Sequence, residues 1–306
     1  MIQSEDFTFL WLVLLAYIFV KAGFDKRVFD NIPKLLFNMC MPALILISFT
    51  DMDGRGIFEP DAIAVSVFSA AYTLLIFVGA RVVLRGYKGE GRKEILVMNM
   101  VMGNVTFVGL PFISFFFGVW GVRLAILFSV VQDFFIWSLC YYMFSQKGGL
   151  KQTLKTVLNP CFVAIALGFV LAGLERPLPA FAVAPLGMLA VMTVPLALLC
   201  IGSMLAQNTG LLRLIDRDVV LSLSLKAFVL PVAVFAVLSV IGVDLRFLWL
   251  CTILTALPTA LLSVMFAKEF EKDADFAKVV FVLSTLLFIL IGTAIHFVRM
   301  QGVLLW

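Results

Sequence analysis

Apolar segments as long as a membrane-spanning helix recur along the whole sequence. A helix needs about 20 apolar residues to cross about 30 Å of hydrocarbon, and ten such segments alternate with short polar connections. Hydrophobic residues make up 63% of the chain, against about 45–50% in soluble domains. The segments are 7–22, 33–50, 61–84, 95–117, 121–144, 157–174, 180–206, 218–242, 246–267 and 276–298. The pattern predicts an all-α integral membrane protein with ten transmembrane helices.

Lysine and arginine gather in every second connection. Of the 23 basic residues, 17 lie in the connections that follow segments 1, 3, 5, 7 and 9, and five lie on the opposite side. Because short cytoplasmic loops carry such an excess, we expect both termini to lie outside the cytoplasm in a multi-pass protein of the inner (plasma) membrane. The net charge of +4 reflects this bias, so we expect the lipid bilayer as a partner and no nucleic acid.

The five cysteines are scattered within the apolar segments. An odd, scattered set predicts neither a disulfide framework nor a metal site. No connection is long enough for a soluble catalytic domain. We therefore expect no metal, no cofactor and no soluble enzyme.

Two of the apolar segments contain residues that interrupt a helix, at corresponding places in the two halves. The first run is 103–111, Gly-Asn-Val-Thr-Phe-Val-Gly-Leu-Pro, and the second is 255–259, Thr-Ala-Leu-Pro-Thr. A break inside lipid frees backbone N–H and C=O groups, so it survives only where protein or a polar cavity surrounds it. Paired breaks of this kind predict the binding site of a transporter.

The ten segments divide into two sets of five. We predict a first repeat at 1–146, a cytoplasmic connection at 147–156 and a second repeat at 157–306, together forming one membrane domain. Since five crossings is an odd number, the second copy enters the membrane from the opposite face and the repeat is inverted. Prolines recur in the second and fourth segments of each half, although prolines are also common in membrane helices. They are Pro42, Pro111, Pro195 and Pro258.

Four short motifs occur in order along the chain. They are Asn38-x-x-Met41-Pro42-Ala43-Leu44, Gly103-Asn104-x-x-x-x-Gly109-Leu110-Pro111, Thr193-Val194-Pro195-Leu196-Ala197-Leu198-x-x-x-Gly202-x-x-Leu205 and Leu257-Pro258. As an ordered set they resemble the auxin efflux carrier family, which includes bacterial malate and malonate carriers and the plant PIN proteins. The resemblance implies an inverted repeat of ten helices, with helices 4 and 9 broken and crossing near the midplane, and a scaffold part beside a transport part. It also implies a homodimer and a small organic anion as substrate.

Residues at the two breaks are the candidates for binding that substrate. Glycine permits unusual backbone geometry, proline removes a helical hydrogen bond, and the amide and hydroxyl side chains are polar. Half-helices that begin at the breaks would present N–H groups to a carboxylate. The alternative is a kinked helix packed by small residues. The candidates are Gly103, Asn104, Thr106, Gly109, Pro111, Thr255, Pro258 and Thr259, with Asn38 and Pro42 added by the family resemblance.

Two charged residues inside the apolar segments are candidates for coupling or charge compensation. Asp133 lies near the middle of its segment, too deep to reach the membrane surface, so it is, together with the adjacent Gln132, a functional candidate for H⁺ or Na⁺ coupling. The alternative is a protonated or hydrogen-bonded structural carboxyl. Lys226 lies about a third of the way into its segment. It is a candidate counter-charge for the substrate or for Asp133, and the alternative is an interfacial anchor whose ammonium extends to the membrane surface.

These features together predict a secondary carrier that moves a small organic anion by alternating access. An anion channel or facilitator of the same fold is the first alternative, since it would also contain broken helices. An intramembrane enzyme is the second. Hydrolysis would need a nucleophile with a base or paired acids, and the apolar segments supply neither combination.

Overall fold

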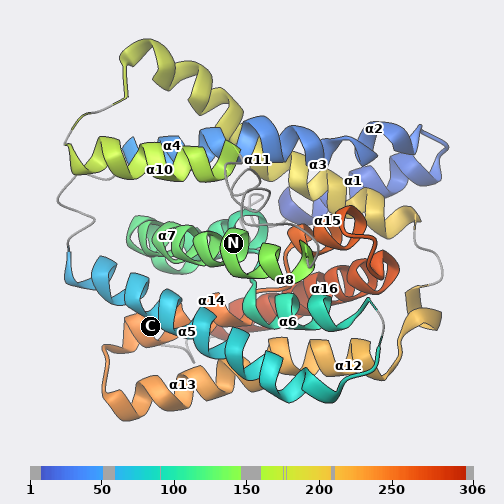
Figure 1. Cartoon of the computed structure of the whole chain (residues 1–306). Coiled ribbons are helices and arrows are strands. Elements are labelled where there is room, and N and C mark those ends of the chain that lie inside the picture. The colour runs from blue at the N-terminus through green and yellow to red at the C-terminus, as the bar shows by residue number, and fades with distance from the viewer. Residues whose placement is uncertain are drawn as a thin grey trace. The chain divides into compact units, whose positions relative to one another are not determined.

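The computed structural model describes residues 8–50, 59–89, 91–145, 160–174, 176, 178–207 and 211–300 (Figure 1). The chain is helical within these ranges, and they contain no strand. Seven of the described helices are long and apolar enough to cross a membrane, and two more apolar helices, Trp11–Lys21 and Pro160–Gly173, are shorter. An all-α chain with several membrane-length helices is therefore confirmed, and ten crossings stay a prediction.

Contacts divide the chain into two compact units. Unit 1 comprises residues 1–59 and 154–211, and unit 2 comprises residues 60–153 and 212–306. Unit 1 thus takes the first two predicted helices of each half, and unit 2 takes the last three. The repeats 1–146 and 157–306 stay a prediction, and the connection 147–156 lies outside the described residues.

Unit 1 is built around the long helix α11. Its helices are α1 (Thr8–Lys21), α2 (Lys26–Asp30), α3 (Ile32–Leu35), the π-helix Leu36–Cys40, α4 (Met41–Thr50), α10 (Pro160–Gly173) and α11 (Ala180–Gln207). α1 packs along α11, and α4 packs against both α10 and α11. Small residues permit these close approaches, as membrane helix pairs generally require. At Gly168, for example, an added Cβ would lie 2.3 Å from the ring of Phe49.

Unit 2 contains both broken segments. Its helices are α5 (Pro60–Val83), the 3₁₀ helix Leu84–Gly86, α6 (Lys93–Val101), the π-helix Val105–Gly109, α7 (Leu110–Phe135), the π-helix Ile136–Cys140, α8 (Tyr141–Ser145), α12 (Arg217–Ser224), the π-helix Leu225–Val229, α13 (Leu230–Ile241), α14 (Leu245–Ala256), α15 (Leu261–Glu269) and α16 (Ala274–Met300). Gly118 interrupts α7 at φ 63° and ψ −156°, a conformation open mainly to glycine. This interruption falls between the predicted segments 95–117 and 121–144.

Proline positions explain three of the four π-helices in the described chain. The π-helices Leu36–Cys40, Val105–Gly109 and Leu225–Val229 end just before Met41-Pro42, Leu110-Pro111 and Leu230-Pro231, respectively. A proline within a helix has no N–H to donate, and its ring crowds the carbonyl four residues earlier. Widening the preceding turn into a π-helix relieves that crowding. The π-helix Ile136–Cys140 precedes no proline, and we have no physical account of it.

Arg92 joins three helix ends of unit 2. Its guanidinium donates to Asp216 at the start of α12, to Asp218 at 3.1 Å, and to Asp273 just before α16 at 2.7 Å. The hydrogen bond that Arg92 donates to Asp216 is the main cause that raises the pKa of Arg92, so the guanidinium stays charged. The hydroxyl of Tyr87 donates to Asp218 at 2.6 Å; burial and this bond raise the pKa of Tyr87 to about 12. The group holds the starts of α6, α12 and α16 together.

Arg246 joins a second set of helix ends. It lies at the start of α14, donates to the carbonyl of Phe117 at 3.0 Å, and stacks on Trp120 with 4.2 Å between the guanidinium and the ring centroid. The indole N–H of Trp120 donates to Asp61 at 3.0 Å. The bond from Arg246 thus reaches the carbonyl of the residue just before the interruption at Gly118. α5, α7 and α14 are thereby joined.

Replacing Arg92 with alanine should lower the free energy of unfolding by about 2 kcal/mol, because hydrogen bonds to charged groups are worth about 1.5–3 kcal/mol and partial exposure screens them. The side chain of Arg92 is 29% exposed and its partners are 24–42% exposed. The melting temperature of the purified protein in detergent measures the loss. Arg85→Ala is the control, because Arg85 is exposed and forms no ion pair with another described residue. Equal melting temperatures for the two variants would contradict a structural role for Arg92.

The difference in melting temperature between wild type and Arg92→Ala should depend on pH, because Arg92 is paired with Asp216. Burial raises its pKa, but hydrogen bonds from the Val219 amide and from Arg92 outweigh burial and hold the pKa below the ordinary 3.8. A carboxyl with a lowered folded-state pKa stabilises the fold above its unfolded-state pKa, and that stabilisation is lost as the pH falls through the folded value. The difference in melting temperature between wild type and Arg92→Ala should therefore be full at pH 6 and should shrink below pH 3.8.

Candidate substrate site

The two breaks meet inside unit 2. α6 ends at Val101, and residues 102–104 are not helical; α14 ends at Ala256, and residues 257–260 are not helical before α15 begins. The backbone N–H of Asn104 donates to the carbonyl of Pro258 at 2.7 Å. Nearly all of α6 is buried, as is most of α14 and α15. The irregular backbone is thus surrounded by protein, as a break at membrane depth requires.

The first break is shorter than the sequence suggests. Only residues 102–104 leave the helix, whereas Gly109 ends a π-helix and Pro111 is the second residue of α7. The ring of Pro111 crowds the carbonyl four residues earlier, and the π-helix Val105–Gly109 relieves that crowding. Pro111 therefore lies within the helical path that begins at Val105, and the interruption lies at Gly103-Asn104.

Side chains of unit 2 pair with the N–H groups of the breaks. The side chain of Gln132 donates from Nε2 to the carbonyl of Val101 at 2.9 Å and accepts from the N–H of Gly103 at 3.4 Å. The N–H of Thr259 donates to Ser284 Oγ at 3.2 Å, and the two hydroxyl oxygens lie 3.1 Å apart. Buried backbone groups need partners. Here the partners are protein, so these N–H groups are not presented to a carboxylate as the sequence suggested.

The glycines of the first break let it approach the second. A Cβ added at Gly109 would lie 2.6 Å from Leu257 Cδ1, and one added at Gly103 would lie 3.2 Å from Leu257 Cβ and 3.3 Å from the Leu254 carbonyl. Neither glycine has a positive φ. The chain therefore needs glycine here for close packing and not for an unusual backbone conformation. The half-buried Thr106 lies between them in the π-helix.

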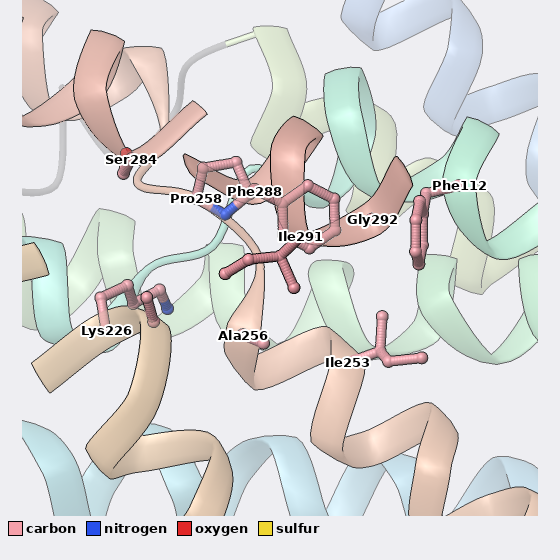
Figure 2. Close-up of a pocket in the computed structure, with 10 residues that line it drawn as sticks. Phe112, Lys226, Ile253, Ala256, Pro258, Ser284, Phe288, Ile291 and Gly292 are labelled. Atoms are coloured by element: carbon pink, nitrogen blue, oxygen red, sulfur yellow. The ribbon is translucent and has the colours of Figure 1, made fainter. Parts of the chain in front are cut away.

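A cavity of about 70 Å³ lies beside the crossing. Helices α7, α14 and α16, the π-helix Leu225–Val229 and the second break all contribute to its wall. The lining residues are Phe112, Lys226, Ala227, Ile253, Ala256, Pro258, Ser284, Phe288, Ile291 and Gly292. Figure 2 shows Lys226 and Ser284 on one side of the view and Phe112 on the other, with Ile291 between them.

Among the described residues of the cavity wall, Lys226 is the only charged one, and it is 2% exposed. Within the described part of the chain, its Nζ has no hydrogen-bond partner. A Cβ added at Gly103 would lie 3.8 Å from this Nζ, which places the ammonium against the first break. Burying an unpaired charge is costly. The side chain therefore does not extend to a surface as an interfacial anchor, and its position favours pairing with an anion.

The other predicted residues have different surroundings. Asp133 is half-buried and does not line the cavity. The hydroxyl of Thr255 donates within its own helix to the Thr252 carbonyl at 2.8 Å. Asn38 and Pro42 belong to unit 1, where the exposed Asn38 donates to the Lys34 carbonyl at 2.8 Å.

Of the predicted residues, the cavity wall includes only Pro258 and Lys226, although the side chains of Asn104 and Gln132 are buried near it. The described residues contain no group of three His, Cys, Asp or Glu that could hold a metal. Sequence reasoning missed Ser284, Phe288, Ile291 and Gly292 because α16 is a regular apolar helix with no interruption. Phe112 directly follows Pro111, a residue that the sequence marks as part of the first break, so its position could have been considered.

The sequence profile of the membrane transport protein family matches residues 3–153 and 149–295. The chain belongs to this family. It is a family of transporters and not of enzymes, so the chain is a multi-pass membrane transporter, and the alternative of an intramembrane enzyme is set aside. Among curated proteins, none matches the chain significantly. The resemblance to auxin efflux carriers is thus confirmed at the level of the family, while malate and malonate stay predictions.

Proposed function

We propose that this membrane transporter is a secondary carrier for a small organic anion, whose carboxylate pairs with Lys226 beside the crossing breaks. One observation carries the proposal. A fully buried lysine lines a cavity at the crossing, and the described residues offer its ammonium no acceptor. A carboxylate in the cavity would supply both the opposite charge and the missing hydrogen bonds.

We further propose that ten helices in two inverted repeats carry this site, with the termini outside the cytoplasm. The division into units supports this arrangement, because corresponding helices of the two predicted halves fall into the same unit. Alternating access would then follow from an exchange of conformations between the halves. Coupling to H⁺ or Na⁺ remains a separate prediction for Asp133, which does not line the cavity.

A carrier and an anion channel differ in counterflow, since only a carrier exchanges labelled for unlabelled substrate through a binding step. The purified full-length protein in liposomes should accumulate labelled carboxylate when preloaded with the same unlabelled compound, and the initial rate should saturate. The panel is malonate, malate, butyrate and indole-3-acetate at pH 7.5, with protein-free liposomes to measure leak. Flux without counterflow or saturation would indicate a channel. No protein-dependent flux of any member would refute organic anion transport.

A further inference from the structure

The cavity has a charged end and an apolar end. Lys226 and Ser284 form the charged end, and Figure 2 shows Phe112 on the opposite side. The apolar end is tightly packed: the Phe112 and Phe288 ring centroids lie 5.0 Å apart in an edge-to-face arrangement, and a Cβ added at Gly292 would lie 2.7 Å from the Phe112 ring. Such a wall matches a molecule with one polar head and a hydrocarbon body.

The charged end can neutralise one carboxylate. Lys226 is the only charged residue that the described part of the chain contributes to the wall. The hydroxyl of Ser284 already donates to the Phe281 carbonyl at 3.0 Å and lies 3.1 Å from the Thr259 hydroxyl. A second carboxylate on the same molecule would lie among Phe112, Phe288 and Ile291 without a counter-charge. Burying an unpaired charge is strongly unfavourable. The wall therefore discriminates against dicarboxylates.

The volume of the cavity limits the size of the hydrocarbon part of the substrate. The cavity measures about 70 Å³, whereas a dry apolar cavity that binds benzene measures about 150 Å³. A few methylene groups fit this space, and an indole ring does not. Each buried methylene should strengthen binding about fourfold until the chain reaches the Phe112 wall.

We propose that the cavity selects a short-chain aliphatic monocarboxylate of about three to five carbons, with its carboxylate on Lys226 and its alkyl end against Phe112 and Phe288. This proposal rests on the proposed function, because it assigns the substrate class of the same site. Phe112 is the residue that sets the length limit. A smaller side chain at this position lengthens the apolar end without altering the charged end.

Binding to the purified full-length protein tests the proposal, because short carboxylic acids also leak across bilayers. Isothermal titration at pH 7.5 with acetate, propionate, butyrate, hexanoate, malonate, malate and indole-3-acetate should show affinity rising to butyrate and falling at hexanoate. Malonate and indole-3-acetate should bind at least tenfold more weakly than butyrate. In Phe112→Leu the ratio of hexanoate to propionate affinity should rise at least fourfold, as expected for one additional methylene.

Phe228→Leu is the matched control, because Phe228 lies in the same π-helix as Lys226, is 52% exposed and does not line the cavity. Its chain-length profile should equal that of the wild type. Tighter binding of malonate, malate or indole-3-acetate than of butyrate would overturn the proposal and leave organic anion transport standing. An unchanged profile in Phe112→Leu would also overturn it. Failure of every compound to bind or to show counterflow would instead refute the proposed function.

Discussion

Methionine in place of Lys226 is expected to reduce carboxylate counterflow at least a hundredfold while raising the melting temperature. Methionine nearly matches the length of lysine but carries no charge. Losing the ammonium of Lys226 from the cavity wall removes the partner of the carboxylate, and a hundredfold loss corresponds to about 2.7 kcal/mol. Removing an unpaired buried charge should also stabilise the protein, because burying a charge without a partner is costly.

The opposite directions of the two effects make this prediction specific. A lysine needed only for folding would lose stability and flux together, whereas an anion-binding lysine loses flux alone. Lys88→Met is the control, because Lys88 is exposed and has no ion pair among the described contacts; both its flux and its melting temperature should match the wild type. Counterflow within threefold of wild type in Lys226→Met would show that the substrate charge is neutralised elsewhere.

The location of the two breaks could be predicted from the sequence, because proline and glycine act through the backbone. The pairs Gly103-Asn104 and Leu257-Pro258 mark the two breaks, and the structure joins them by the bond from Asn104 to Pro258. The extent of each break was harder to predict. Pro111 follows a π-helix within a continuous helical path, and a sequence pattern does not separate that arrangement from an open break.

The roles of polar side chains could not be read in the same way, because hydrogen bonding depends on tertiary neighbours. Thr255 and Thr259 both supply hydroxyl groups, yet one bonds to its own helix and the other to Ser284 on α16. Gln132 is predicted to take part in coupling with Asp133, and in the structure its side chain pairs with the backbone of the first break. Polar side chains near the breaks thus mainly form hydrogen bonds with the backbone groups of the breaks.

The surroundings of the Lys226 side chain could not be predicted from the sequence either. Its depth along an apolar segment left two interpretations open, since a lysine side chain can extend several ångströms towards a surface. The decisive feature is the π-helix Leu225–Val229, which carries Lys226. Pro231 supplies a sequence signal for that turn, because three of the described π-helices come immediately before an X-Pro pair. The direction in which the turn points the side chain depends on the helices around it.

Alanine in place of Gly202 is expected to destabilise unit 1 by at least about 3 kcal/mol, because overpacking typically costs about 1–3 kcal/mol and here the obstacle is backbone. A Cβ at this position would lie 2.0 Å from the carbonyl oxygen of Val13 and 2.9 Å from Ala16 Cβ. A carbonyl in α1 cannot move aside as a flexible side chain can, so α1 and α11 must separate. The melting temperature and the yield of folded protein in detergent measure the effect.

Gly187→Ala provides a control within the same helix. Gly187 also lies in α11, but an added Cβ there would meet no atom within 4 Å. Since alanine favours helix by about 1 kcal/mol over glycine, this variant should be as stable as the wild type or slightly more stable. Equal losses in the two variants would show that the effect does not come from the contact with Val13, and equal stability of Gly202→Ala and wild type would refute the close contact of α1 with α11. The motif around Gly202 is visible in the sequence, but its reason lies in a carbonyl nearly 190 residues away, which is why only the folded chain explains it.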